Sequence, residues 1–197
     1  MSWNDRYLAH DTPWDLGQPS TLVQALVREV LPPGARLLVP GCGLGHDVVA
    51  LALAGYEVIG LDLAPAAIDR ARALHGEPPG VTWRVGDLLA PSTLLEGTLD
   101  GVIEHTCYCA LAPDGPGSAP LDAYADAVHR LLRAGGALIG AFLAFDDGGQ
   151  GPPWGTSTDR LQARFGDRFT VERLAAWPPF GPRGVPQLAA IFRKPSR

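Results

Sequence analysis

The sequence predicts an α/β fold in which a doubly wound, mostly parallel seven-stranded sheet is covered by helices on both faces. Short apolar runs without polar alternation take turns along the chain with helical segments, as strands buried on both faces require. The rhythm changes near the carboxyl end, where two apolar runs follow one another across a turn rich in proline and glycine. This change predicts that the last strand is antiparallel.

The expected elements follow in chain order from Ser20, a candidate N-cap for a helix over 21–31. Pro32 and Gly34 lie in the segment that ends this helix. A buried strand, a glycine-rich turn and a helix are then expected over 35–40, 41–45 and 46–54. The remaining expected elements are strands over 56–61, 81–85, 99–104 and 137–145, helices over 65–75, 121–132 and 158–164, and closing strands over 168–176 and 187–193.

Length and composition favour one globular domain spanning residues 1–197 and exclude a mostly disordered chain. The net charge of −5 makes nucleic acid and anionic membranes poor partners. No signal segment or bilayer-length apolar run is present, so a cytoplasmic location is expected. The three cysteines do not have zinc-site spacing, and no metal is expected.

The sharpest local signal is the turn after the first expected strand. Gly41, Gly43 and Gly45 allow positive φ and close approach of a ligand to the backbone. Asp62 lies 21 residues after Gly41, where an acid of a doubly wound sheet accepts hydrogen bonds from ribose hydroxyls. The dinucleotide motif G-x-G-x-x-G fails because His46 occupies its third glycine position. The turn therefore favours a nucleoside without pyrophosphate, such as S-adenosylmethionine.

A second signal follows the third expected strand. In an adenosine site Asp87 would accept a hydrogen bond from the exocyclic amine while Leu88 packs on the ring. The same residues are equally typical of a simple turn facing solvent.

The motifs VPGCGLGHDV, GLDLAPAAI and the GD after the third strand resemble class I S-adenosylmethionine-dependent methyltransferases. The opening WNDRY, the DTPWDLGQP that follows it and the later GPPW resemble the thiopurine S-methyltransferase and halide/thiol methyltransferase family. The resemblance extends from Trp3 to about Arg193. It implies S-adenosylmethionine as cofactor, S-adenosylhomocysteine as product, and a thiol, sulfide or halide as the small-molecule acceptor.

The resemblance also implies residue roles. An aromatic flap over 1–20 would close on the methionine side of the cofactor, where aromatic faces stabilise a sulfonium cation. Glu104 matches a position that is acidic in the halide/thiol branch and arginine in the animal thiopurine enzymes. The implied cofactor-binding residues are Trp3, Tyr7, Trp14, Gly41, Gly43, Asp62, Asp87, Leu88 and Glu104.

Acceptor contacts are expected just after the fourth strand, because ligands of open α/β sheets bind at the carboxyl ends of strands. His105 is a candidate proton acceptor and Tyr108 a candidate to orient the nucleophile; Trp154 is a third candidate contact. Methyl transfer depends mainly on positioning and desolvation, so no catalytic triad is required. A monomer or weak homodimer is expected. The alternatives are a nicotinamide-dependent oxidoreductase and a non-catalytic domain that binds the cofactor.

Overall fold

The computed structural model of the protein describes residues 1–90 and 96–196. Within them, seven strands form one sheet in the order β3-β2-β1-β4-β5-β7-β6. Strands β1 to β5 pair in parallel, and β7 runs antiparallel to both β5 and β6. The expected fold class, including the antiparallel last strand, is therefore confirmed. The strands are β1 (Arg36–Pro40), β2 (Glu57–Asp62), β3 (Val81–Val85), β4 (Leu99–His105), β5 (Leu132–Leu143), β6 (Thr170–Phe180) and β7 (Val185–Arg193).

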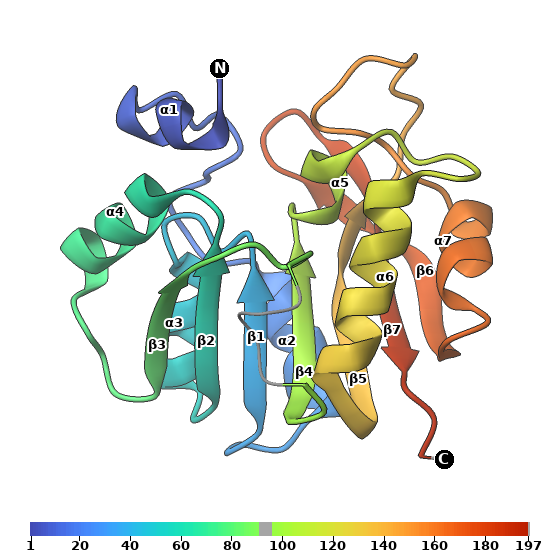
Figure 1. Ribbon diagram of the computed structural model, residues 1–197, viewed down its shortest axis with the longest axis horizontal. Helices are drawn as coiled ribbons and strands as arrows, with labels where there is room; N and C mark the ends of the chain where they lie inside the picture. The colour runs from blue at the N-terminus through green and yellow to red at the C-terminus, as the bar shows by residue number, and fades with distance from the viewer. Residues whose placement is uncertain (91–95, 197) are drawn as a thin grey trace.

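Helices cover both faces of the sheet, as Figure 1 shows, with α6 and α7 in front and α2 and α3 behind. Helix α1 lies above the carboxyl ends of the parallel strands, and the turn between β6 and β7 reaches the same end. The helices are α1 (Trp3–Leu8), α2 (Thr21–Val30), α3 (His46–Leu53), α4 (Pro65–His75), α5 (Tyr108–Leu111), α6 (Ala119–Leu131) and α7 (Thr158–Phe165).

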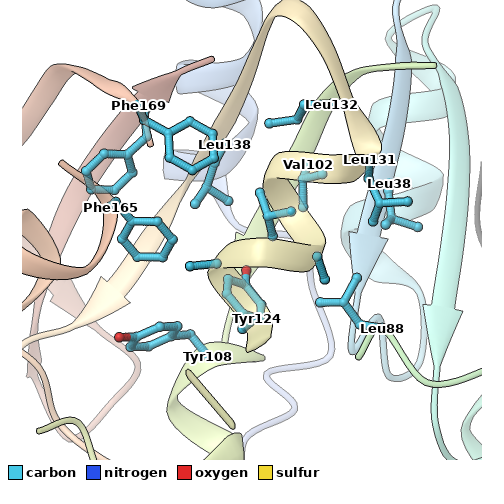
Figure 2. Packing of buried hydrophobic residues seen from close by; sticks show 14 of the residues in the cluster. Leu38, Leu88, Val102, Tyr108, Tyr124, Leu131, Leu132, Leu138, Phe165 and Phe169 are labelled. Carbon is cyan, nitrogen blue, oxygen red and sulfur yellow. The ribbon is translucent and has the colours of Figure 1, made fainter. Parts of the chain in front are cut away.

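The core has two layers because each central strand is buried on both faces. On β1, Leu38 points into one hydrophobic cluster while Leu37 and Val39 point into the other. The first cluster includes an aromatic group between the sheet and helices α6 and α7, seen in Figure 2 around Tyr124 and Phe165. The second cluster packs α2, α3 and α4 against the opposite face. The apolar runs of the sequence are thus explained by burial on two sides.

The sequence prediction placed most elements within a few residues but missed two helices. Helix α1 begins after Ser2, whose hydroxyl accepts from the Asp5 amide while the Asp5 carboxylate accepts from the Ser2 amide. This capping box is the sequence signal from which the start of α1 could have been predicted. Helix α5 is only one turn long. Two strands are longer than expected: β5 starts directly at Leu132, and β6 continues through the prolines that were assigned to a turn.

Candidate functional site

A cavity of about 750 Å³ lies at the carboxyl ends of β1, β2 and β4. The strand order reverses between β1 and β4, and ligands of doubly wound sheets bind at such a switch point. Residues of the amino-terminal segment, including Trp14, line one side of the cavity. The end of β6, including Phe180, and the β6–β7 turn line another. Two segments from opposite ends of the chain therefore meet over the strand ends (Figure 1).

The glycine-rich turn joins β1 to α3 at the floor of this cavity. Gly43 has φ +54°, and a Cβ there would come within 2.9 Å of the Tyr7 hydroxyl oxygen. Gly45 has φ +80° and caps α3; a Cβ there would be 2.3 Å from the Trp83 ring. Only glycine therefore fits either position. The absence of a side chain at Gly45 lets α3 pack closely against Trp83 of β3. The absence of a side chain at Gly43 leaves room for the Tyr7 hydroxyl of α1.

Asp62 ends β2 and lines the cavity beside this turn. Its two carboxylate oxygens accept from the backbone amides of Gly43 and Ala64, each at 2.9 Å. Burial raises the pKa of Asp62 above its ordinary value, and these two amide donors oppose that rise. Since a carboxylate has about four acceptor sites, Asp62 retains capacity for further donors.

The tripeptide after β3 also reaches the cavity. Asp87 and Leu88 both line it. The Asp87 side chain accepts from the Leu89 amide at 2.8 Å, which fixes a local turn. Leu88 is buried. The sequence-predicted pair is thus brought to the same cavity as Asp62.

Three aromatic residues of the amino-terminal segment pack together at the cavity wall. The Trp14 ring contacts Trp3 and Tyr7 edge-on, with centroid distances of 5.3 and 5.8 Å. The Arg6 guanidinium lies over Trp14, 4.5 Å from the ring centroid. One cation of the chain therefore already occupies a face of this cluster.

Helix α1 is held on α4 by two hydrogen bonds that involve polar groups of this segment. The Asn4 side chain accepts from the Ala66 amide at 2.9 Å, and Arg70 donates to the Tyr7 carbonyl at 3.1 Å. Burial raises the pKa of the Tyr7 hydroxyl, and the nearby Asp62 carboxylate adds to the rise. Tyr7 is therefore a neutral phenol placed between the glycine turn and Asp62.

A histidine–aspartate pair closes the region between β1 and β4. His105 ends β4, and its Nδ1 lies 2.6 Å from Asp47 Oδ2 on α3. The other Asp47 oxygen accepts from the Ser20 amide at 2.7 Å. Both His105 and Asp47 line the cavity. Sequence reasoning named His105 but missed Asp47, although Asp47 stands within the quoted motif VPGCGLGHDV.

Glu104 corrects the sequence prediction, because it does not line the cavity. It is 1% exposed and accepts from the amides of Cys107 and Tyr108 and from the Tyr124 hydroxyl. Burial raises the pKa of Glu104, against the pull of these three donors. The carboxylate thus holds the loop after β4 rather than facing a ligand.

Tyr108 and Trp154 are also placed differently from the prediction, since neither lines the cavity. Tyr108 is buried, and its hydroxyl accepts from Arg164 Nε at 2.9 Å. Figure 2 shows its ring within the aromatic cluster of the core. The Trp154 amide donates to the Cys109 carbonyl at 2.7 Å, which ties the segment of Trp154 to α5.

The wall opposite the glycine turn is largely apolar, and the sequence analysis missed it. Its residues Pro178, Pro179 and Pro182 were interpreted only as part of a turn, because a run of prolines shows no periodicity. Its lining residues are Leu16, Leu143, Pro152, Pro153, Trp177, Pro178, Pro179, Phe180 and Pro182. Over the residues that the structure describes, no cluster of three or more potential metal ligands occurs, and no helix has the length and apolarity needed to span a bilayer.

The same fold occurs in the N-methyltransferase NodS from Bradyrhizobium japonicum in complex with S-adenosyl-L-homocysteine, with a TM-score of 0.76. That structure is 20% identical in sequence, and the match covers 97% of this chain and 96% of that one. At this identity the likeness shows that the two chains share a fold.

The family model for thiopurine S-methyltransferase (TPMT) matches residues 1–183, and the chain belongs to that family. A probable thiol methyltransferase 2 of Arabidopsis thaliana is 32% identical over 171 residues, which are 81% of this chain and 69% of the relative. A thiopurine S-methyltransferase of Bordetella petrii is 30% identical over 192 residues, covering 85% of this chain and 84% of the relative. The family uses S-adenosylmethionine and methylates small nucleophiles.

Proposed function

We propose that this chain binds S-adenosylmethionine along the glycine turn and transfers its methyl group to a thiol, sulfide or halide in the cavity. The observation that carries the proposal is the pairing of Gly43 with Asp62. Asp62 holds the turn through the Gly43 amide and still has acceptor capacity on the side that lines the cavity. Bound S-adenosylmethionine supplies an electrophilic methyl group on a sulfonium sulfur.

The chain's residues fit the nucleoside part of this cofactor. Asp62 would accept from the ribose hydroxyls, because a carboxylate has about four acceptor sites and the amides of Gly43 and Ala64 do not take them all. Asp87 and Leu88 would flank the adenine on the other side of β2. Gly41 and Gly43 line the cavity and carry no side chain, so they would let the ligand approach the backbone closely.

The aromatic flap over residues 1–20 fits the sulfonium end. Tyr7 would present its ring to the cation, and Trp3 and Trp14 would exclude water around it. Arg6 already lies over Trp14, so the sulfonium would bind a face that Arg6 leaves open. Glu104 and Tyr108 would act indirectly, by holding the loop that carries His105.

The acceptor would enter on the apolar side formed by the β6–β7 turn. A cavity that is apolar with a few polar groups at one end is typical of small-molecule sites. We propose a single domain over 1–197 that acts in the cytoplasm as a monomer or weak homodimer, without a nucleic-acid or membrane partner.

Calorimetric titration with S-adenosylmethionine and S-adenosylhomocysteine, with NADH as the control ligand, tests the proposal. Binding of both sulfur nucleosides and none of NADH is expected. Preferential binding of NADH would establish the oxidoreductase alternative instead. Nucleoside binding without methyl transfer to iodide, bisulfide, thiophenols or thiopurines would establish the non-catalytic alternative.

A further inference from the structure

The contact between His105 and Asp47 is more buried than an ordinary surface contact, and Asp47 is also held by a second hydrogen bond. Their side chains are 14% and 12% exposed, and Nδ1 and Oδ2 lie 2.6 Å apart. The second Asp47 oxygen is taken by the Ser20 amide at 2.7 Å, at the start of α2. Asp47 is thus fixed from two sides, and the orientation of the imidazole follows from it.

This arrangement determines which ring nitrogen of His105 carries the proton. An ionised carboxylate can only accept a hydrogen bond, so Nδ1 must be the donor in the contact with Asp47. Neutral imidazole then has a free lone pair on Nε2. Among the residues described, Nε2 is buried and has no hydrogen-bond partner. Nε2 of His46 and of His75 is also unpaired, but His46 Nε2 lies 3.3 Å from Asp15 Oδ1 and His75 does not line the cavity. His105 combines an unpaired Nε2 with a carboxylate on Nδ1 and a place at the cavity.

The surroundings of His105 indicate which group would bind to its Nε2. The ring lines the cavity, and Phe180 of β6 packs on it edge-on at a centroid distance of 5.3 Å. The cavity is also lined by Leu143 of β5, by Pro152 and Pro153 after it, and by Trp177 and prolines at the end of β6. Two acids act on the ring: Asp47 on α3 contacts it, and Glu104 precedes it on β4. Arg6 and Arg183 also line the cavity, so it combines a proton acceptor backed by carboxylates with an apolar wall and charges of both signs.

We propose that His105 is the general base of this enzyme, positioned by Asp47, and that its acceptor is an apolar thiol which arrives protonated. The inference rests on the proposed function and deepens it by choosing neutral thiols over small inorganic anions. A thiol donates its S–H hydrogen bond to Nε2 and packs its body against the wall near Phe180. A halide has no proton to give, and it meets a lone pair backed by carboxylates.

The chemical step balances without another reactant. The thiol proton moves to His105 Nε2, which leaves an electron pair on the acceptor sulfur. That pair forms the new bond to the transferred methyl carbon, and the bond from this carbon to the donor sulfur breaks to leave a neutral thioether. The imidazolium is stabilised by Asp47 until it releases its proton to water. A thiol that is only a few per cent ionised at neutral pH gains most from such a base.

The decisive experiment compares two acceptors of similar shape on matched variants. Benzyl thiol is largely protonated at neutral pH, whereas nitrothiophenol is largely ionised. For His105→Gln we expect kcat/KM with benzyl thiol to fall by about 10² to 10³-fold, the usual worth of a general base. With nitrothiophenol it should change by less than about threefold, because no proton has to be removed. Asp47→Asn should give the same selective loss at smaller size.

Two variants serve as controls. His129→Gln changes a histidine that does not line the cavity, and Asp69→Asn changes an exposed acid on α4. Both should retain wild-type rates with both acceptors. Wild-type enzyme should have a higher kcat/KM with benzyl thiol than with iodide, because iodide offers no proton to Nε2 and has no apolar body to pack near Phe180.

A measurement without turnover completes the test. Nitrogen-15 NMR of the histidine rings, with His105→Gln to assign the signal, should find the proton of neutral His105 on Nδ1, and Asp47→Asn should abolish this preference. A proton on Nε2, equal losses with both acceptors, or faster methylation of iodide than of benzyl thiol would overturn the inference. Failure of the proposed function is a separate result: no calorimetric binding of S-adenosylhomocysteine by the wild-type protein.

Discussion

Asp62 and Glu104 invite comparison, because both are buried acids near the carboxyl ends of the strands that flank β1. Each accepts from two backbone amides, those of Gly43 and Ala64 for Asp62 and those of Cys107 and Tyr108 for Glu104. Burial raises the pKa of both. Glu104 additionally accepts from the Tyr124 hydroxyl on α6 and is sealed from the cavity, which Asp62 lines.

The difference teaches that position at a strand end does not by itself assign a role to an acid. Helix α6 covers the end of β4, and its Tyr124 binds the Glu104 carboxylate, which therefore has a structural role. The end of β2 faces the cavity, so the Asp62 carboxylate remains available to a ligand. The following five predictions separate these roles, from the largest effect to the smallest.

Glu104→Ala should lower the free energy of unfolding by about 3–5 kcal/mol. It leaves two backbone amides and the Tyr124 hydroxyl without an acceptor, and each unsatisfied buried group costs about 1–3 kcal/mol. Urea denaturation measures the loss. S-adenosylhomocysteine affinity in the folded protein should change little; a tenfold loss of affinity with unchanged stability would mean that Glu104 contacts the ligand.

Asp62→Asn should weaken S-adenosylhomocysteine binding by about 10- to 150-fold, equivalent to the 1.5–3 kcal/mol of a hydrogen bond to a charged group. The asparagine keeps the shape but loses half of the acceptor capacity of the carboxylate. Calorimetry measures the change, and Asp69→Asn is the matched control. Unchanged affinity would remove Asp62 from the site.

The two acids should also respond differently to pH. A folded-state pKa raised above the unfolded value means that the folded protein binds more protons, so stability falls as pH rises from about 4.5 through the raised pKa. Glu104→Gln should remove the contribution of Glu104 to this slope, which is at most about 1.4 kcal/mol per pH unit for one group. The raised pKa of Asp62 leaves a contribution of the same sign. Denaturation midpoints between pH 4 and 8 measure it.

For Asp62 the same shift should appear in ligand binding, because the ionised form accepts from ribose. Affinity for S-adenosylhomocysteine should fall as pH is lowered through the raised pKa of Asp62. The fall should begin at a higher pH than for an ordinary aspartate. It should be absent in Asp62→Asn, and an identical pH dependence in that variant would contradict the assignment.

Tyr124→Phe should have the smallest effect, a loss of about 1 kcal/mol in unfolding free energy, the typical net value of one hydrogen bond. It removes one donor to Glu104 and leaves both amide bonds and the packing of the ring in place. Affinity for the nucleoside should be unchanged. A stability loss as large as that of Glu104→Ala would show that Tyr124 dominates the anchor.

Much of the fold was predictable because periodicity and end signals are local. The central parallel strands were placed nearly to the residue, since burial on two faces leaves a continuous apolar run. Helix α4 was placed to the residue because Pro65 begins it and Gly76 follows its last residue. The edge strand β3 was also placed to the residue. Helix α1 was missed because its six residues are too few to show a period. The prolines at the end of β6 were assigned to a turn, as their composition indicates, although they extend a strand at the edge of the sheet.

The sequence by itself determined the glycine turn, the acid after β2 and the alternation of strands and helices, because each depends on residues that are neighbours in the chain. Only the tertiary structure decided which side chains meet. His105 and Asp47 are 58 residues apart, and Glu104 and Tyr124 are 20 apart. Such pairs form where packed elements bring distant segments together, and no local pattern of polarity encodes that distance.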